Sequence, residues 1–206
     1  MSLIKKGGGL YLDVGANVGV FTILAANFFD NVISFEPGKS AGSRLMNNIQ
    51  KNTAQNIQVV QKAVSDSTGT MTLFENPINL GGSSLEGFSS EYRESLVGRE
   101  WVEYNVDIVT LDDYFQNNPV SSIGMIKIDV EGHEVQVLRG AIAILNKFEP
   151  LLYVEAHTHA HFLQISDELP EQYKAWDPLS KMLIPQQPDR WEYLNVVFAV
   201  QNPFLD

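Results

Sequence analysis

The sequence predicts an α/β fold in which helices cover both faces of a mostly parallel sheet. Short apolar runs typical of buried strands alternate with helical patterns along most of the chain. The 206 residues, 44% of them hydrophobic, are enough for one compact core but few for two. We therefore expect a single domain over residues 1–206, with right-handed crossovers between the parallel strands.

The N-terminal half is expected to contain two strand–helix units followed by one arm of a hairpin. Apolar runs bounded by turn residues predict the strands, and apolar residues spaced three and four apart predict the helices. The expected elements are a strand at 10–14, a helix at 18–28, a strand at 32–35, a helix at 41–52, a strand at 57–64 and a hairpin arm at 69–75.

A long irregular segment follows at 76–98, and we interpret it as a lid or binding loop. It is rich in glycine and serine and contains Gly81-Gly82-Ser83-Ser84. Irregular stretches of this length in a small domain are usually functional, although an ordinary surface loop is the alternative. The two glycines can act as hinges, while Ser83 and Ser84 can donate hydrogen bonds to a cofactor or substrate.

The C-terminal half continues the alternation of strands and helices. The stripe of apolar residues after Glu134 has the spacing of a helix that faces the core. The expected elements are a strand at 102–109, a helical turn at 111–115, a buried strand at 123–130, a helix at 134–146, a central strand at 151–156, a polar segment at 167–176 and a last strand at 194–200, for which an antiparallel course is open.

Composition excludes several classes of partner. Lysine and arginine number 14 against 25 aspartates and glutamates, and the net charge of -11 repels nucleic-acid phosphates and anionic lipids. No apolar run approaches the roughly 20 residues that span a bilayer, and no signal peptide is visible. The lack of cysteine suits a reducing compartment, so we expect a soluble, cytoplasmic protein.

No feature predicts an oligomeric state. Met1-Ser2-Leu3 is compatible with an expression scar, and an N-terminal segment of the natural protein is then missing.

The turn after the first strand has the features of a ligand-binding bend. Gly15 and Gly19 allow close backbone approach, but the third glycine of a dinucleotide-binding turn is absent. Asp13 just before the turn would repel a pyrophosphate and suits an ammonium group or hydroxyls instead. Glu36, about 20 residues further on, is placed to hold a ribose diol. The predicted ligand is a nucleoside with a positively charged tail; Asn17 either contacts it through the side-chain amide or only supports the bend.

Each of these residues also has a purely structural interpretation. The glycines can simply permit a tight turn, Asp13 can cap the helix, and Glu36 can be a solvated turn residue beside Pro37. Their joint order favours the ligand site.

Five sequence blocks together resemble the FkbM family of S-adenosylmethionine-dependent methyltransferases. They are Asp13-Val14-Gly15-Ala16-Asn17-Val18-Gly19, Phe35-Glu36-Pro37, Gly81-Gly82-Ser83-Ser84, Thr110-Leu111-Asp112-Asp113 and Ile126-Lys127-Ile128-Asp129-Val130-Glu131-Gly132-His133-Glu134. The resemblance covers roughly residues 10–156 and implies a class I methyltransferase fold, a Rossmann-like three-layer sandwich with seven strands, the last antiparallel. It also implies S-adenosylmethionine as cofactor and a hydroxyl of a small molecule, sugar, glycan precursor or polyketide as methyl acceptor. Ser65 and Asp66 then follow the third strand near the expected adenine, and Asp129 lies at the active site.

A hydroxyl acceptor attacks the methyl group more readily when it loses its proton, so we expect a general base near the methyl group. Strand alternation puts Lys127 and Asp129 on one face, where they can pair. Glu131 and His133 follow in the turn and are candidates to reach a substrate hydroxyl; His133 has a reference pKa near 6.5. Alternatively, Glu131 only favours the helix start and His133 is an exposed turn residue.

A second group of candidates follows the central strand at 151–156. If the backbone stays extended, the side chains of Glu155, His157, His159 and His161 share one face and can supply a base or hold a divalent metal with Asp129 or Glu131. We expect a metal-free site, with His157 among the catalytic candidates. Two other functions stay open: a nicotinamide-dependent oxidoreductase, which the missing glycine disfavours, and a nucleoside-binding module without turnover.

Overall fold

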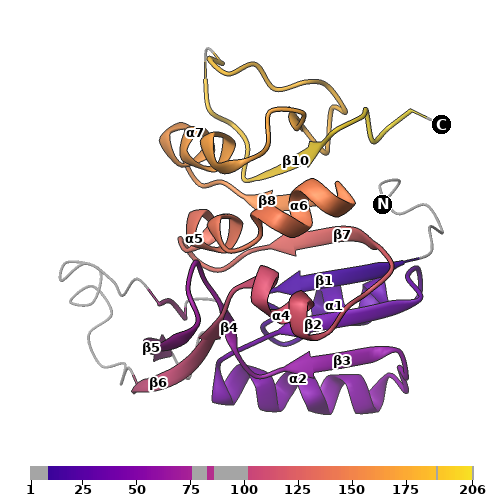
Figure 1. The fold of residues 1–206 in the computed structure, drawn as a ribbon, viewed down its shortest axis with the longest axis vertical. Helices are drawn as coiled ribbons and strands as arrows, with labels where there is room; N and C mark the ends of the chain where they lie inside the picture. Colours follow the sequence, from indigo (N-terminus) through magenta and orange to yellow (C-terminus); the bar gives the residue numbers. More distant parts are fainter. Residues whose placement is uncertain (1–8, 76–82, 86–101, 189, 206) are drawn as a thin grey trace.

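A computed structural model describes residues 9–75, 83–85, 102–188 and 190–205, which form two sheets with flanking helices (Figure 1). The larger sheet has seven strands in the order β3-β2-β1-β7-β8-β10-β9, and the smaller has three in the order β4-β6-β5. The strands are β1 Leu10–Val14, β2 Asn31–Phe35, β3 Ile57–Val60, β4 Ala63–Val64, β5 Gly69–Glu75, β6 Val102–Val109, β7 Ile123–Ile128, β8 Leu151–Glu155, β9 Lys174–Trp176 and β10 Asn195–Ala199.

The larger sheet is parallel except at β10, which confirms the predicted architecture. Strands β3, β2, β1, β7 and β8 pair in parallel, whereas β10 runs antiparallel to both of its neighbours, β8 and β9. The strand order reverses between β1 and β7, and open α/β sheets bind ligands beyond the carboxyl ends of the strands at such a point. The small sheet lies beyond those carboxyl ends (Figure 1).

Helices pack on both faces of the larger sheet. Helix α1 covers the face that carries Tyr11, Val32 and Met125, while α4 to α7 share one core with Leu12 and Ile126 of the opposite face. Alternation along β1 and β7 explains this division, because successive side chains point to opposite faces. The helices are α1 Val20–Ala25, α2 Lys39–Lys51, α4 Leu111–Asn117, α5 Glu134–Arg139, α6 Ile142–Phe148 and α7 His159–Glu168.

Two predicted elements are divided in the structure. The expected strand at 57–64 contributes β3 to the larger sheet and β4 to the smaller one. The expected helix at 134–146 is interrupted at Gly140, where a Cβ would lie 2.1 Å from the carbonyl oxygen of Ser65. The carboxylate of Asp112 then accepts hydrogen bonds from the backbone N–H groups of Ala143 and Ile144, which starts α6 anew.

Other predictions differ at the C-terminal side or lie outside the described part. The prediction missed α7 and β9; Thr158 caps α7 by accepting a hydrogen bond from the backbone of His161. Most of the proposed lid, including Gly81 and Gly82, lies outside the described residues, and only Ser83–Leu85 belongs to them. Among the helices in the described ranges, none is long and apolar enough to cross a membrane.

Candidate functional site

A cavity of about 320 Å³ lies beyond the carboxyl ends of β1 and β7. Its walls come from the first turn, the end of β2, the small sheet and the ends of β7 and β8. The lining residues are Val14 to Val18, Val20, Phe21, Phe35 to Pro37, Lys62 to Val64, Leu73, Ser83, Leu85, Lys127, Asp129 to Glu131 and Glu155. The volume is within the range of small-molecule sites.

The first turn forms the floor of this cavity and depends on Gly15. Its backbone has φ +77, and a Cβ there would lie 1.9 Å from the carbonyl oxygen of Asp129. The N–H groups of Gly15 and Ala16 both donate to the carbonyl of Phe35, so the turn is tied to β2. Asn17 follows with φ 51, a left-handed conformation that asparagine tolerates better than most residues. Close contact between β1 and β7 therefore requires the glycine.

Glu36 lies at the end of β2 with its carboxylate fixed by the backbone. One oxygen accepts a hydrogen bond from Gly38 N at 2.8 Å and the other from Asn17 N at 2.7 Å. Burial raises the pKa of Glu36 to about 7, against the lowering effect of these two N–H groups. A carboxylate oxygen can accept more than one hydrogen bond and Glu36 lines the cavity, so the side chain can also accept hydrogen bonds from a ligand's hydroxyls.

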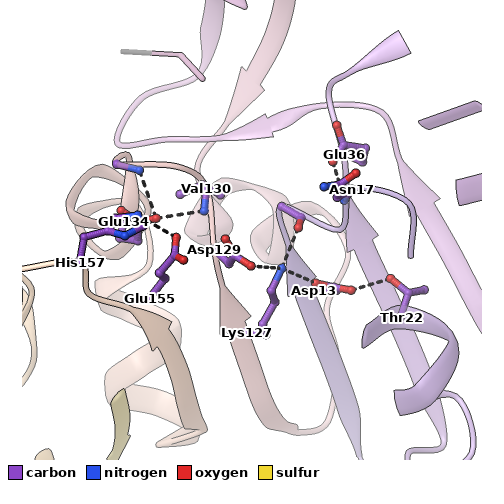
Figure 2. A network of polar contacts seen from close by, with 12 residues as sticks. Asp13, Asn17, Thr22, Glu36, Lys127, Asp129, Val130, Glu134, Glu155 and His157 are labelled. Atoms are coloured by element: carbon purple, nitrogen blue, oxygen red, sulfur yellow. Dashed lines mark hydrogen bonds and ion pairs between the residues drawn. The ribbon is translucent and has the colours of Figure 1, made fainter. Parts of the chain in front are cut away.

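Lys127 joins β1 to β7 through a buried ionic network, which Figure 2 shows. Its ammonium group lies 3.3 Å from carboxylate oxygens of Asp13 and Asp129, and it donates to the carbonyl of Gly15 at 2.7 Å. Burial alone would lower the pKa of Lys127, but the two carboxylates outweigh it and raise that pKa. The predicted pairing of Lys127 with Asp129 is confirmed.

Asp13 occupies a different position from the one we predicted. The residue has 0% exposure, does not line the cavity, and accepts a hydrogen bond from the Thr22 hydroxyl at 2.6 Å besides pairing with Lys127. Alternation sends its side chain under α1 rather than toward the cavity. Asp13 is thus linked to the cavity through its ion pair with Lys127, which lines it.

Asn17 lines the cavity and carries a buried side-chain acceptor. Its side-chain Oδ1 is buried and has no hydrogen-bond partner among the described residues, although Asn17 lines the cavity. A buried acceptor without a partner costs free energy, which a donor on a ligand would recover. Together with the glycine floor and the oriented Glu36 carboxylate, this atom fits a nucleoside that donates hydrogen bonds.

Carboxylates gather at the opposite side of the cavity, where β7 and β8 end. Asp129, Glu131 and Glu155 line it. Burial and repulsion from Asp129 and Glu134 raise the pKa of Glu131 to about 7, and burial with repulsion from Asp129, Glu131 and Glu134 raises that of Glu155 to about 8. These two carboxyl groups can take up a proton near neutral pH, as a general base must.

His157 contacts this group, but the other histidines of its segment are differently placed. Its Nε2 lies 3.0 Å from Glu155, and Figure 2 shows the two side chains together. Ligand atoms of Glu131, Glu155 and His157 all lie within 4.8 Å of one another, a spacing that a metal ion could use. The extended course on which the shared face of these side chains depended ends at Thr158, because α7 begins at His159. His161 pairs instead with buried Glu134 at 3.2 Å.

The structure places four other predicted residues outside the cavity lining. Ser65 and His133 are buried and contact each other at 2.8 Å, Asp66 is exposed, and Gly19 lies under Leu45 of α2. The predicted base His133 is thus held at the start of α5, and Ala63 and Val64 line the cavity where Ser65 and Asp66 were expected.

The described part of the glycine-serine block lies at the cavity. Ser83 and Leu85 line it, while Ser84 pairs its backbone with Phe74 of β5 and donates its hydroxyl to the carbonyl of Glu131 at 3.2 Å. Ser84 therefore connects the small sheet to the turn that carries Glu131.

Some lining residues had no sequence signal as site residues. Phe21, Lys62 and Leu73 belong to ordinary amphipathic or strand patterns, and only the fold brings them to the cavity. Lys127 was predicted to pair with Asp129, but its second carboxylate partner, Asp13 of β1, had no local sequence signal.

The strand order and the cavity beyond the carboxyl ends of the strands give the chain the class I methyltransferase fold. The FkbM methyltransferase domain family model matches residues 13–183, and the chain belongs to that family. The solved structure of methyltransferase FkbM from Methylobacillus flagellatus KT has the same fold, with a TM-score of 0.60 and 20% identity over 93% of this chain and 43% of that one.

Two curated relatives of this chain are named for different methyl acceptors. Hexuronic acid methyltransferase AglP of Haloferax volcanii is 26% identical over 148 residues, which cover 72% of this chain and 55% of AglP. The 31-O-demethyl-FK506 methyltransferase FkbM of Streptomyces tacrolimicus is 27% identical over 155 residues, 65% of this chain and 59% of the relative. The chain thus spans little more than half the length of these relatives.

Proposed function

We propose that the chain is an S-adenosylmethionine-dependent O-methyltransferase whose acceptor is a hydroxyl of a sugar, glycan precursor or polyketide-like small molecule. The observation that carries the cofactor assignment is the Glu36 carboxylate, held by two backbone N–H groups at the edge of the cavity. The acceptor class is supported by relatives named for a hexuronic acid and for 31-O-demethyl-FK506.

The cofactor would occupy the part of the cavity between the first turn and the end of β2. Glu36 would accept the ribose hydroxyls, Asn17 Oδ1 would accept a donor of the ligand, and Ala63, Val64 and Leu73 would give an apolar wall for a base. When bound, S-adenosylmethionine supplies a methyl group on a positively charged sulfur. The carboxylates of the opposite side favour that charge.

The acceptor would enter on the side of Asp129, Glu131 and Glu155. Glu155 or Glu131 would take the hydroxyl proton, since both carboxyl groups have pKa values raised to about 8 and about 7. His157 contacts Glu155 at 3.0 Å and is placed to pass that proton on to solvent. Asp129 is held by Lys127 and orients the acceptor.

Calorimetry with S-adenosylhomocysteine and with NAD⁺ tests the cofactor assignment. We expect the first to bind and the second not to bind, because the first turn lacks the third glycine of a pyrophosphate-binding turn. Methyl transfer from labelled S-adenosylmethionine to a panel of glycosides and hydroxylated polyketides then tests the acceptor class. Binding of NAD⁺ alone would overturn the proposal.

Cofactor affinity is expected to fall as the pH falls through about 7. Glu36, with a pKa of about 7 in the free protein, accepts ribose hydrogen bonds best when it is ionised. Protonation below that pKa competes with binding, so affinity should be about tenfold weaker at pH 6 than at pH 8. Titration of S-adenosylhomocysteine at both pH values measures this. Glu36→Gln should bind weakly at both and lose this part of the dependence; an unchanged dependence in the variant would remove Glu36 from the site.

A further inference from the structure

Glu75, the last residue of β5, lies outside the cavity but contacts the start of α2. The residue is 3% exposed, and one carboxylate oxygen accepts hydrogen bonds from the N–H groups of Ser40 at 2.9 Å and Ala41 at 3.4 Å. The other oxygen accepts from the hydroxyl of Tyr104 on β6 at 2.7 Å. That hydroxyl in turn accepts from the N–H of Lys39 at 2.7 Å. The antiparallel strands β5 and β6 thus satisfy the first free N–H groups of the helix.

Helix α2 has no cap of its own. Its N-cap residue is Gly38, which has no side chain, and its first turn contains no acidic residue. Free N–H groups and the positive end of the helix dipole normally attract a local oxygen or carboxylate. Here the carboxylate comes from a strand 35 positions further along the chain.

Gly38 lies between Glu75 and the cofactor residue. Its N–H donates to Glu36 Oε1 at 2.8 Å. A Cβ on Gly38 would lie 2.8 Å from that same oxygen and 3.0 Å from Glu75 Oε1. The position of Gly38 therefore depends on the carboxylate on each side of it, and any movement of the helix start away from Glu75 moves the donor that fixes Glu36.

We infer that Glu75 is a positioning residue for cofactor binding, because it holds the start of α2 and through Gly38 sets the orientation of the Glu36 carboxylate. The inference rests on the proposed role of Glu36 toward the ribose. It makes the small sheet part of the cofactor site, although Glu75 itself does not touch the ligand.

A measurement without ligand tests the link to Gly38. Amide hydrogen exchange of Gly38, Ser40 and Ala41 is compared between the unaltered chain, Glu75→Ala and the control Glu171→Gln, which changes an exposed glutamate after α7. We expect all three amides to exchange faster in Glu75→Ala and none to change in the control. Faster exchange at Ser40 and Ala41 with an unchanged Gly38 would show a helix cap only and overturn the inference.

Binding of S-adenosylhomocysteine gives the functional readout. Glu75→Ala should raise the Kd about tenfold, Glu75→Gln less because one oxygen remains, and Glu171→Gln not at all. Adding Glu36→Gln should make the effect of Glu75→Ala disappear, since Glu75 acts through Glu36. Equal Kd values for folded Glu75→Ala and the unaltered chain, or additive effects, would contradict the inference.

Two further results distinguish a wrong inference from a variant that does not fold and from a wrong proposed function. If Glu75→Ala does not fold, Tyr104→Phe removes one of the same contacts and should raise the Kd in the same direction. If the unaltered chain does not bind S-adenosylhomocysteine, the proposed function fails, and the exchange of Gly38 still decides whether Glu75 holds the turn.

Discussion

Lys127→Met is expected to lower the free energy of unfolding by about 3–5 kcal/mol, because it leaves the buried carboxylate of Asp13 without its ionic partner. Methionine keeps the length and apolar stem of the side chain, so lost packing contributes little. For a chain of this size the loss corresponds to a melting temperature lower by about 10 °C or more. Thermal and urea unfolding measure the change.

The matched control is the double variant Asp13→Asn with Lys127→Met. It removes the uncompensated charge while an amide can still bond to Thr22, so it should recover part of the lost stability. If Lys127→Met unfolds at the same temperature as the unaltered chain, the ionic network is not important for the stability of the β1–β7 contact. Recovery in the double variant would locate the cost at Asp13 rather than at Asp129, which is partly exposed.

Gly15→Ala is expected to cost about 3 kcal/mol or more and to abolish measurable binding of S-adenosylhomocysteine. A left-handed backbone costs an alanine about 1–2 kcal/mol, and the new Cβ also meets the Asp129 carbonyl, which cannot move without disturbing the β1–β7 pair. Displacing the turn also moves the Gly15 carbonyl that holds Lys127. Urea unfolding and calorimetry provide the two measurements.

Gly132→Ala is a control for Gly15→Ala that separates the cost of the left-handed backbone from the cost of a steric clash. Gly132 has φ +99, but a Cβ there has nothing within 4 Å. It should therefore show only the cost of the left-handed conformation. If Gly15→Ala and Gly132→Ala lowered the free energy of unfolding equally, the contact of the first turn with β7 would not be as close as described.

Local sequence patterns predicted those contacts that depend only on residues close together in the chain. The strand alternation that paired Lys127 with Asp129 is correct, because it requires only period-two geometry within one strand. The partner on the other side, Asp13, was predicted to face the ligand but is buried beside Lys127, since its environment is set by the strand order that puts β7 beside β1. Sequence alone does not determine which strand becomes that neighbour.

The candidate site could also be predicted only in part, because some of its contacts join residues that are far apart in the sequence. Glu36 and Glu131 line the cavity as the strand ends indicated, whereas His133 contacts Ser65, which follows β4 and is 68 positions away in the sequence. The helix start at Thr158 separated His159 and His161 from the cavity; a threonine followed by a helical pattern was a local signal that was not used. Glu75 carried no signal, because its role depends on the docking of a hairpin onto α2.

Strand β10 lies between β8 and the edge strand β9, so it joins that edge to the rest of the larger sheet. Strand β9 reaches the sheet only through β10, in the order β8-β10-β9. A truncation that removed residues 195–199 would therefore detach two strands at once and leave the backbone groups of β8 as an open edge, a template for aggregation between molecules.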